Sequence, residues 1–235
     1  MGTWTNYLAC TSGRAVNGTN VNAANADVTY AGTHNFVGVP FGTFLYFFAA
    51  GPGVDPNYSG TTSEAYNWGW NQAVYAASQY STYGPAVSAH LMFMDVEKGT
   101  GKLGAGTYNG WNSQAANCGQ SLINSYMSPS LDQATFNGFQ YYIMHYTSFW
   151  PGAYSSPSFW NYTFGAGSSY GSIPTTFEWT SESESSSVTP GPSGWCMGGT
   201  CAGWFGGSND PLAWQWSTSA LNGAGDFDQT DSNNY

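Results

Sequence analysis

The sequence has very few charged side chains and almost no basic ones. Three Lys and Arg residues stand against 13 Asp and Glu in 235 residues, which gives a formal net charge of −10. Charged residues make up 7% of the chain, against roughly a quarter in an ordinary globular protein. Nucleic acids and anionic membranes are bound through Lys and Arg, so this balance argues against both as partners.

Long apolar runs and the common catalytic motifs are also missing. No run reaches the roughly 18 apolar residues that suggest a membrane span, and the longest candidate, FVGVPFGTFLYFFAAGPGV, is broken by Gly and Pro. The opening MGTWTNYLAC has neither the basic start nor the apolar stretch of a signal peptide, so the chain is interpreted as a mature form or one lacking its original start. There is no P-loop and no HExxH helix, and no G-x-G-x-x-G stands at a predicted strand–helix turn.

Aromatic residues are abundant, at 18% of the chain, together with 31 Gly. Disordered chains are poor in aromatics, so we interpret the chain as folded, with residues 1–235 as one domain. Its surface is then covered by uncharged polar side chains, so the charge of that surface changes little in acid. That composition suits a secreted, extracellular protein.

Four cysteines occur, and we expect them to form disulfides. In CMGGTC a Gly-Gly turn separates Cys196 from Cys201, which favours their pairing and leaves Cys10 with Cys118. Free thiols and a zinc site are the alternatives. The spacing is not CxxC, and no His lies at ligand spacing near these residues. We therefore predict neither a metal nor a cofactor, and disulfides indicate an oxidising compartment.

Apolar runs typical of buried strands alternate with helical patterns. We expect strands at 43–51, 90–97, 151–156, 175–180 and 211–217, and helices at 61–81 and 128–147. The alternation predicts an α/β fold with a parallel sheet, open or closed into a barrel. Capping boxes are predicted at the starts of the two helices, formed by Thr61 with Glu64 and by Ser130 with Gln133.

Two acids end the apolar segment HLMFMDVE. Because side chains alternate along a strand, Asp95 and Glu97 share one side, and the carboxyl end of a parallel strand is where barrel enzymes place catalysis. Repulsion and partial burial should raise the pKa of one acid while the other stays ionised. A proton donor beside a carboxylate is what the cleavage of a glycosidic bond requires. The alternative is an Asp-x-Glu that only ends a strand.

Further candidates lie in the C-terminal half. Asp226 and Asp228 share a strand face if GDFDQTD is extended, although a solvated tail is the simpler interpretation. Glu178, in FEWT, is as readily a structural hydrogen-bond partner as a catalyst. Aromatic residues near strand ends and loops suit the C–H faces of sugar rings, although most large aromatics are core; they are Trp111, Trp150, Trp160, Trp179, Trp204, Trp214, Trp216 and Tyr154.

Five segments in order resemble the landmarks of family-25 glycoside hydrolases: HLMFMDVEKG, GAYSSPSFW, FEWT, AWQWS and GDFDQTD. They look closer still to the secreted actinobacterial glycoside hydrolase-like proteins of that superfamily. The resemblance implies an irregular TIM-like (β/α) barrel. It also implies a lysozyme-like muramidase that cleaves the β-1,4 link between N-acetylmuramic acid and N-acetylglucosamine in peptidoglycan, so that cell-wall polysaccharide or another glycan is the expected partner.

The same resemblance assigns roles to individual residues. Glu97 is implied as the proton donor, and Asp95 as a stabiliser of the transition state or an orienter of the substrate acetamido group. The third acid is implied to be Asp226 or Asp228, with Asp228 preferred. Tyr154 matches a tyrosine that lines the site, and Trp214 with Gln215 match a pair at its floor.

The N-terminal region departs from the family pattern. Family members begin with a strand that carries a Gly-Ile/Phe-Asp pattern, and nothing in MGTWTNYLACTSGRAVNG matches it. The first strand is therefore absent or rebuilt. An alternative function follows: a catalytically inactive carbohydrate-binding or extracellular structural domain on the same barrel.

Overall fold

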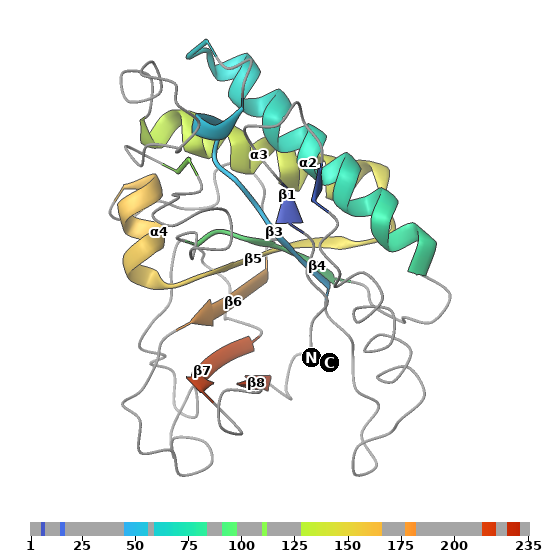
Figure 1. Ribbon diagram of the computed structural model, residues 1–235, viewed down its shortest axis with the longest axis vertical. Helices are drawn as coiled ribbons and strands as arrows, with labels where there is room; N and C mark the ends of the chain where they lie inside the picture. Colours follow the sequence, from blue (N-terminus) through green and yellow to red (C-terminus); the bar gives the residue numbers. More distant parts are fainter. Residues whose placement is uncertain are drawn as a thin grey trace.

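The computed structural model describes ten stretches of the chain: residues 6–7, 15–16, 45–55, 59–83, 91–97, 110–111, 128–165, 177–181, 213–219 and 225–230. Strands and helices alternate along it (Figure 1). The strands are β1 (Asn6–Tyr7), β2 (Ala15–Val16), β3 (Leu45–Phe48), β4 (Leu91–Asp95), β5 (Trp150–Ser155), β6 (Phe177–Ser181), β7 (Ala213–Ser219) and β8 (Gly225–Thr230). The helices are η1 (Pro52–Val54), α2 (Thr62–Tyr83), α3 (Pro129–Tyr146) and α4 (Pro157–Phe164).

The fold is mixed α/β and is built on a parallel sheet, as the alternation of patterns predicted. β3, β4, β5 and β6 pair in parallel in chain order. β7 joins β6 in parallel and β8 returns antiparallel to β7. At the other side β1 pairs in parallel with β3 and in antiparallel fashion with β2. As described, β2 and β8 are the two edges of this sheet.

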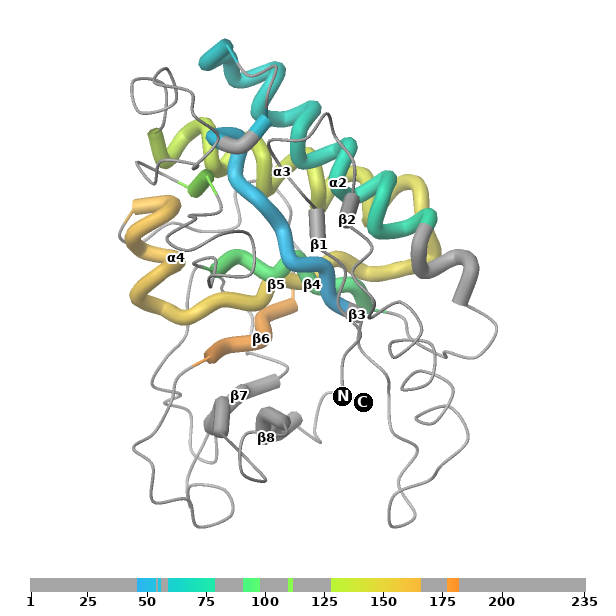
Figure 2. The backbone as a smooth tube through the Cα atoms, viewed as in Figure 1, coloured from blue at the N-terminus to red at the C-terminus, as the bar shows by residue number. Residues whose placement is uncertain are grey.

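Helices α2, α3 and α4 cover one face of the sheet. Figure 2 shows α2 and α3 lying together across the strands, with α4 beside β5 and β6. The core between the layers takes every second residue of the strands, including Phe47, Met92, Met94 and Ala153, and packs them against Phe136, Phe139, Ile143, Trp160 and Phe164 of the helices. The central strands β4 and β5 are buried on both faces, apart from Trp150 at the start of β5, as expected of strands in a parallel sheet.

The first helix begins as its sequence predicts. The Glu64 backbone N–H donates to Thr61 Oγ1 at 3.2 Å, and Glu64 Oε2 accepts from the Thr61 N–H at 3.4 Å and from the Ser59 hydroxyl at 2.6 Å. This reciprocal arrangement confirms the capping box. These hydrogen bonds, that of the Ser59 hydroxyl first, lower the pKa of Glu64.

The predicted capping box of the second helix is wrong. Helix α3 has Ser128 as its N-cap and Pro129 in its first turn, and no side chain caps it. Ser130 contacts the Ser128 hydroxyl, and Gln133 donates instead to Asn137 one turn on. Pro129 at the first helical position suits a helix start, since its missing N–H would have no intrahelical partner there.

Helix α4 was not predicted. Its eight residues, PSFWNYTF, are too few to show a clear helical period, and they follow directly on β5. The signal that was available is Ser156 before Pro157: the Ser156 hydroxyl accepts from the Phe159 N–H at 3.2 Å, as an N-cap does.

The cysteines, Cys10, Cys118, Cys196 and Cys201, all lie outside the described residues, and so does the predicted pairing. Within the described residues no group of His, Cys, Asp and Glu is arranged to hold a metal ion. Of the helices in that part of the chain, none combines the length and apolarity that crossing a membrane requires.

Candidate functional site

The candidate site is the carboxyl end of the central strand β4, where Asp95 is the last residue. Asp95 is 3% exposed although it ends its strand. Its Cα pairs with Phe48 of β3 on one side and with Tyr154 of β5 on the other, and Tyr154 pairs in turn with Trp179 of β6. A buried carboxyl group therefore sits in a row of aromatic residues that crosses the middle of the sheet.

This row lies on the sheet face opposite the helices. Phe93 and Leu91 share the face with Asp95 because they precede it at steps of two, and they cluster with Tyr154 and Trp179. Trp179 is central to the cluster: its ring centroid lies 4.6 Å from that of Tyr154 and 5.6 Å from those of both Tyr46 and Phe93. Phe93 could have been predicted from sequence to share this face, because it lies two residues before Asp95.

The environment raises the pKa of Asp95 well above its ordinary value. Burial is the larger cause, because it penalises the charged form, and the negative charge of nearby Glu97 is the second. Asp95 Oδ1 accepts no hydrogen bond from any residue in the described part of the chain. The sequence predicted that one of the two acids would have a raised pKa, and that acid is Asp95.

Backbone hydrogen bonds fix the short segment that carries Glu97. The Val96 N–H donates to the Tyr154 carbonyl at 2.8 Å, and the Ser155 hydroxyl donates to the Val96 carbonyl at 2.7 Å. On the other side the Ala49 N–H donates to the Asp95 carbonyl at 2.9 Å. Pairing thus continues beyond the strand ends on both sides, and it holds half-buried Glu97 two residues beyond Asp95.

Residues Ala49 and Ala50, which follow β3 and lie next to this segment, are also held by hydrogen bonds. The buried amide of Gln72, on α2, grips the backbone of Ala50 by accepting from its N–H and donating to its carbonyl, each at 2.8 Å. The Trp68 indole N–H donates to the same carbonyl at 2.9 Å, and the Trp111 indole N–H donates to the Ala49 carbonyl at 3.3 Å. The carboxyl end of β3 is therefore anchored to the helix layer, beside Asp95.

The register of β7 and β8 places the C-terminal candidates relative to Glu97. Gln215 pairs with Ser181 of β6, and Asp228 pairs with Gln215. Ser181 lies two residues beyond Trp179, just as Glu97 lies two residues beyond Asp95. Glu97 and Asp228 therefore belong to the same level of the sheet, at its carboxyl edge. Trp214 pairs with Thr180 one level below, and Asp226 lies in β8 two residues before Asp228.

Glu178 is not brought to the same place. It pairs with Ala153, which packs in the core beneath the helices, so Glu178 lies on the face opposite Asp95, where it is fully buried. Two aromatic candidates also lie away from the Asp95 face, since Trp111 and Trp160 are fully buried in the helix-side core.

The first strand of the sheet adds a residue that the sequence did not reveal. In β1, Asn6 pairs with Phe48, which is the register partner of Asp95. Asn6 thus occupies the Asp95 row, in a strand beside β3. A two-residue strand within a polar segment leaves no periodic pattern, so sequence reasoning could not find it.

Comparison with known proteins adds no relative: no family model, curated protein or solved structure matches the chain.

Proposed function

We propose that this protein is a secreted glycoside hydrolase that acts on the β-1,4-linked amino-sugar glycan of peptidoglycan, with Glu97 as the proton donor. The observation that supports this best is the pair formed by Asp95 and Glu97 at the carboxyl end of a central parallel strand. One acid is buried with a raised pKa and the other is half-buried. Two carboxyl groups in unequal environments are what general acid catalysis at a glycosidic oxygen requires.

The chemistry that we propose has the two acids share one proton. Because Asp95 is buried beside Glu97, the pair retains a proton at a pH where an isolated Asp would have lost it. A sugar bound over Glu97 would exclude water there and raise its affinity for that proton. Glu97 then protonates the oxygen of the glycosidic bond as that bond breaks, while the Asp95 carboxylate stabilises the positive charge that develops on the sugar ring. Water adds to the anomeric carbon and returns a proton to the carboxylate pair, which completes the hydrolysis.

Neighbouring residues suit a sugar ligand. Tyr154 and Trp179 lie in the same row as Asp95 but are themselves buried in their cluster, so in this proposal they line the site beneath the sugar and do not offer it an open ring face. Gln215 would extend this surface along β7, whereas Trp214, which pairs with Thr180, belongs to the other face of the sheet. Glu178 would act at most indirectly, through the strand that carries Trp179.

The proposal includes a barrel-like curvature of the sheet. β4 and β8 are four strand positions apart, which amounts to about 19 Å in a flat sheet. Catalytic carboxyl pairs lie about 5–9.5 Å apart, so Asp228 can assist Glu97 only if the sheet curls into an irregular (β/α) barrel. We prefer Asp228 to Asp226 because its register partner Gln215 lies at the level of Glu97.

The test is the release of reducing ends from purified peptidoglycan and from β-1,4-linked N-acetylglucosamine oligomers. We expect Glu97→Gln to lower the rate by about 10²–10⁴-fold, the usual contribution of a general acid. Glu64→Gln, which removes a carboxylate from the start of α2, should retain activity. Asp228→Asn compared with Asp226→Asn decides between the two C-terminal acids. Equal release by the wild type and Glu97→Gln would end the proposal.

A second candidate is a glycan-binding domain without turnover, and Asn6 favours it. The resemblance to family-25 hydrolases places an active-site Asp on the first strand, whereas β1 has Asn6 in the Asp95 row. A wild type that binds peptidoglycan but releases no reducing ends would select this candidate.

A further inference from the structure

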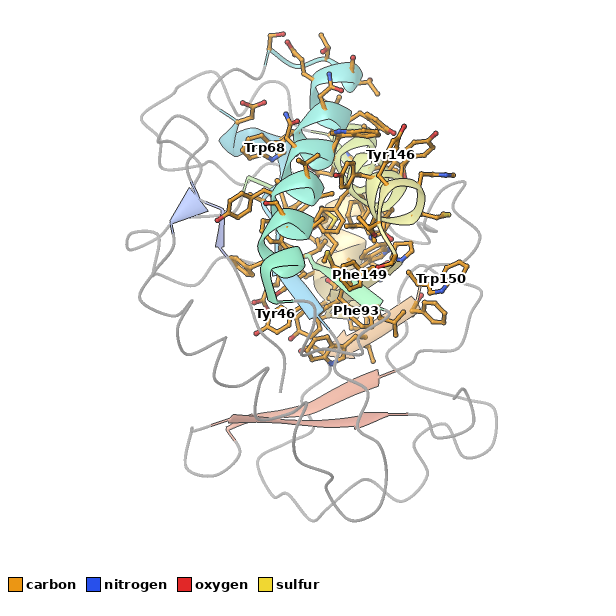
Figure 3. All side chains as sticks on the ribbon, turned by 90° about the vertical axis from the view of Figure 1, so that its right-hand side faces the viewer. Tyr46, Trp68, Phe93, Tyr146, Phe149 and Trp150 are labelled. Atoms are coloured by element: carbon orange, nitrogen blue, oxygen red, sulfur yellow. The ribbon has the colours of Figure 1, made fainter. Side chains whose placement is uncertain are left out.

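A set of exposed and half-buried aromatic rings on the helix layer is not used by the site on β4. It consists of Tyr66 and Trp70 on α2 and Tyr141, Tyr142 and Tyr146 on α3; we call it the ring platform. Tyr146 is 61% exposed and Tyr141 40% exposed. In Figure 3 Tyr146 lies high on the helix layer, away from Phe93 on the sheet. The platform and Asp95 are thus on different sides of the molecule.

The rings of the platform form one connected surface. The Trp70 ring centroid lies 6.0 Å from that of Tyr141, in a stacked arrangement, and 5.1 and 5.0 Å from those of Tyr142 and Tyr146, edge to face. Tyr142 and Tyr146 stack at 5.4 Å, and Tyr66 joins both Trp70 and Tyr141. These contacts hold exposed rings in fixed positions, so a ligand would not have to order them.

The backbone beneath the platform is equally fixed. A Cβ on Gly138 would collide with the Tyr66 carbonyl, and a Cβ on Gly69 would collide with the Thr135 carbonyl. The Thr135 hydroxyl also donates to the Ala65 carbonyl at 2.9 Å. The two helices therefore touch backbone to backbone, which brings the rings of α2 against those of α3.

The chemistry of the platform suits a neutral ligand. Neither helix contains Lys or Arg, and their acids are Glu64, held by its capping bonds, and Asp132, which is buried. Burial is the main cause that raises the pKa of Tyr66, so its phenol stays neutral and can donate a hydrogen bond. Flat aromatic faces edged by hydroxyl groups fit sugar rings, which present C–H faces and hydroxyls.

We propose that the ring platform is a second glycan-binding surface, which holds a neutral β-linked polysaccharide chain on the side of the protein away from Asp95. An anionic ligand is disfavoured because neither helix carries Lys or Arg; the basic side chain at the platform is that of His145, whose ring centroid lies 4.1 Å from that of Tyr141. A second copy of the chain is disfavoured because each copy carries a net charge of −10. A holding site remote from the acids keeps the protein on an insoluble polymer. It requires no turnover and therefore stands independently of the proposed hydrolase.

The test is retention on insoluble chitin at a series of protein concentrations, which gives a dissociation constant. Loss of one stacked ring should raise that constant about tenfold, the equivalent of about 1.4 kcal/mol, in Tyr146→Ala and Trp70→Ala. Trp70→Phe keeps a ring and should weaken binding less. The matched controls are Tyr162→Ala and Val74→Ala, which remove exposed apolar side chains outside the platform and should bind as the wild type does.

Three outcomes would overturn the proposal. They are no retention of the wild type, an equal loss in the control variants, and a dimer in sedimentation velocity that Tyr146→Ala dissociates, which would assign the platform to a second copy. Hydrolysis of short soluble oligomers separates the two proposals: it should disappear in Glu97→Gln and persist in Tyr146→Ala.

Discussion

Asp95 and Tyr154 are register partners in β4 and β5, so a buried carboxyl group and a phenol ring lie side by side on the face of the sheet opposite the helices. The aromatic surroundings remove water from the carboxyl group, and Glu97 adds a negative charge two residues away. Both effects favour the protonated form of Asp95. The acid at the centre of the proposed site therefore also makes the stability of the fold depend on pH.

The first prediction concerns this pH dependence. A carboxyl group whose pKa is raised by folding binds more protons in the native than in the unfolded state. The free energy of unfolding should therefore fall as the pH rises above the unfolded pKa of Asp95, about 3.9, with a limiting slope of about 1.4 kcal/mol per pH unit. Asp95→Asn should remove this slope, measured by urea unfolding from pH 4 to 8.

Glu97→Gln serves as the partial control for that experiment. It removes the charge that is the smaller cause of the shift but leaves the burial, so the destabilisation should begin at the same pH as in the wild type, end at a lower pH and be smaller in total. Stability curves of the wild type and Asp95→Asn that run parallel over the whole range would contradict a raised Asp95 pKa.

The second prediction uses the two helix starts. Thr61→Ala removes the side-chain acceptor of the Glu64 N–H and should lower the free energy of unfolding by about 1 kcal/mol. Ser130→Ala, at the position wrongly predicted to cap α3, should change it by less than about 0.5 kcal/mol. Urea unfolding of the two variants at pH 7 makes the comparison. Equal effects would mean that the α2 cap is not a stabilising feature.

The helices and strands could be predicted from the sequence more readily than the way in which they pair and pack. Strands β3 to β7 and helices α2 and α3 were predicted within a few residues, because apolar strands and a helical period leave local patterns. The faces of the sheet depend on register, which no local pattern encodes. Asp95 could be paired with Glu97 by spacing alone, whereas the separation of Glu178 from Asp95 follows from the pairing of Ala153 with Glu178.

The same limit explains what the sequence did not reveal. The grip of Gln72 on Ala50 spans 22 residues, and the ring platform joins two helices that are far apart in the chain. The ring platform depends on a helix packing in which Gly69 and Gly138 meet the opposite backbone, and a lone Gly in a helical pattern gives no indication of its partner.

The third prediction concerns Gln72. Gln72→Leu keeps the approximate volume but leaves the buried Ala50 N–H without its acceptor, while the Ala50 carbonyl keeps Trp68. An unsatisfied buried donor costs about 1–3 kcal/mol, so the free energy of unfolding should fall by that amount. Hydrogen exchange of the Ala50 amide should accelerate as well. Unchanged exchange in a destabilised variant would show that the bond is not what protects this amide.

The fourth prediction tests the close approach of α2 and α3. At an open helical position, Gly→Ala stabilises a protein by up to about 1 kcal/mol. Gly138→Ala should instead destabilise it by about 1–3 kcal/mol, because the added methyl meets the Tyr66 carbonyl and the helices must separate.

Asn71→Ala, at an exposed α2 position, is the matched control and should be neutral or slightly stabilising in the same urea titration. Separation of the helices would also loosen the contact of Trp70 with Tyr141 and Tyr146. Gly138→Ala should therefore shift the Trp emission of the folded protein and weaken its retention on chitin, whereas Asn71→Ala should do neither. A Gly138→Ala protein as stable as the wild type would mean that the helices can move apart without cost, and the rigid ring platform would then lose its physical basis.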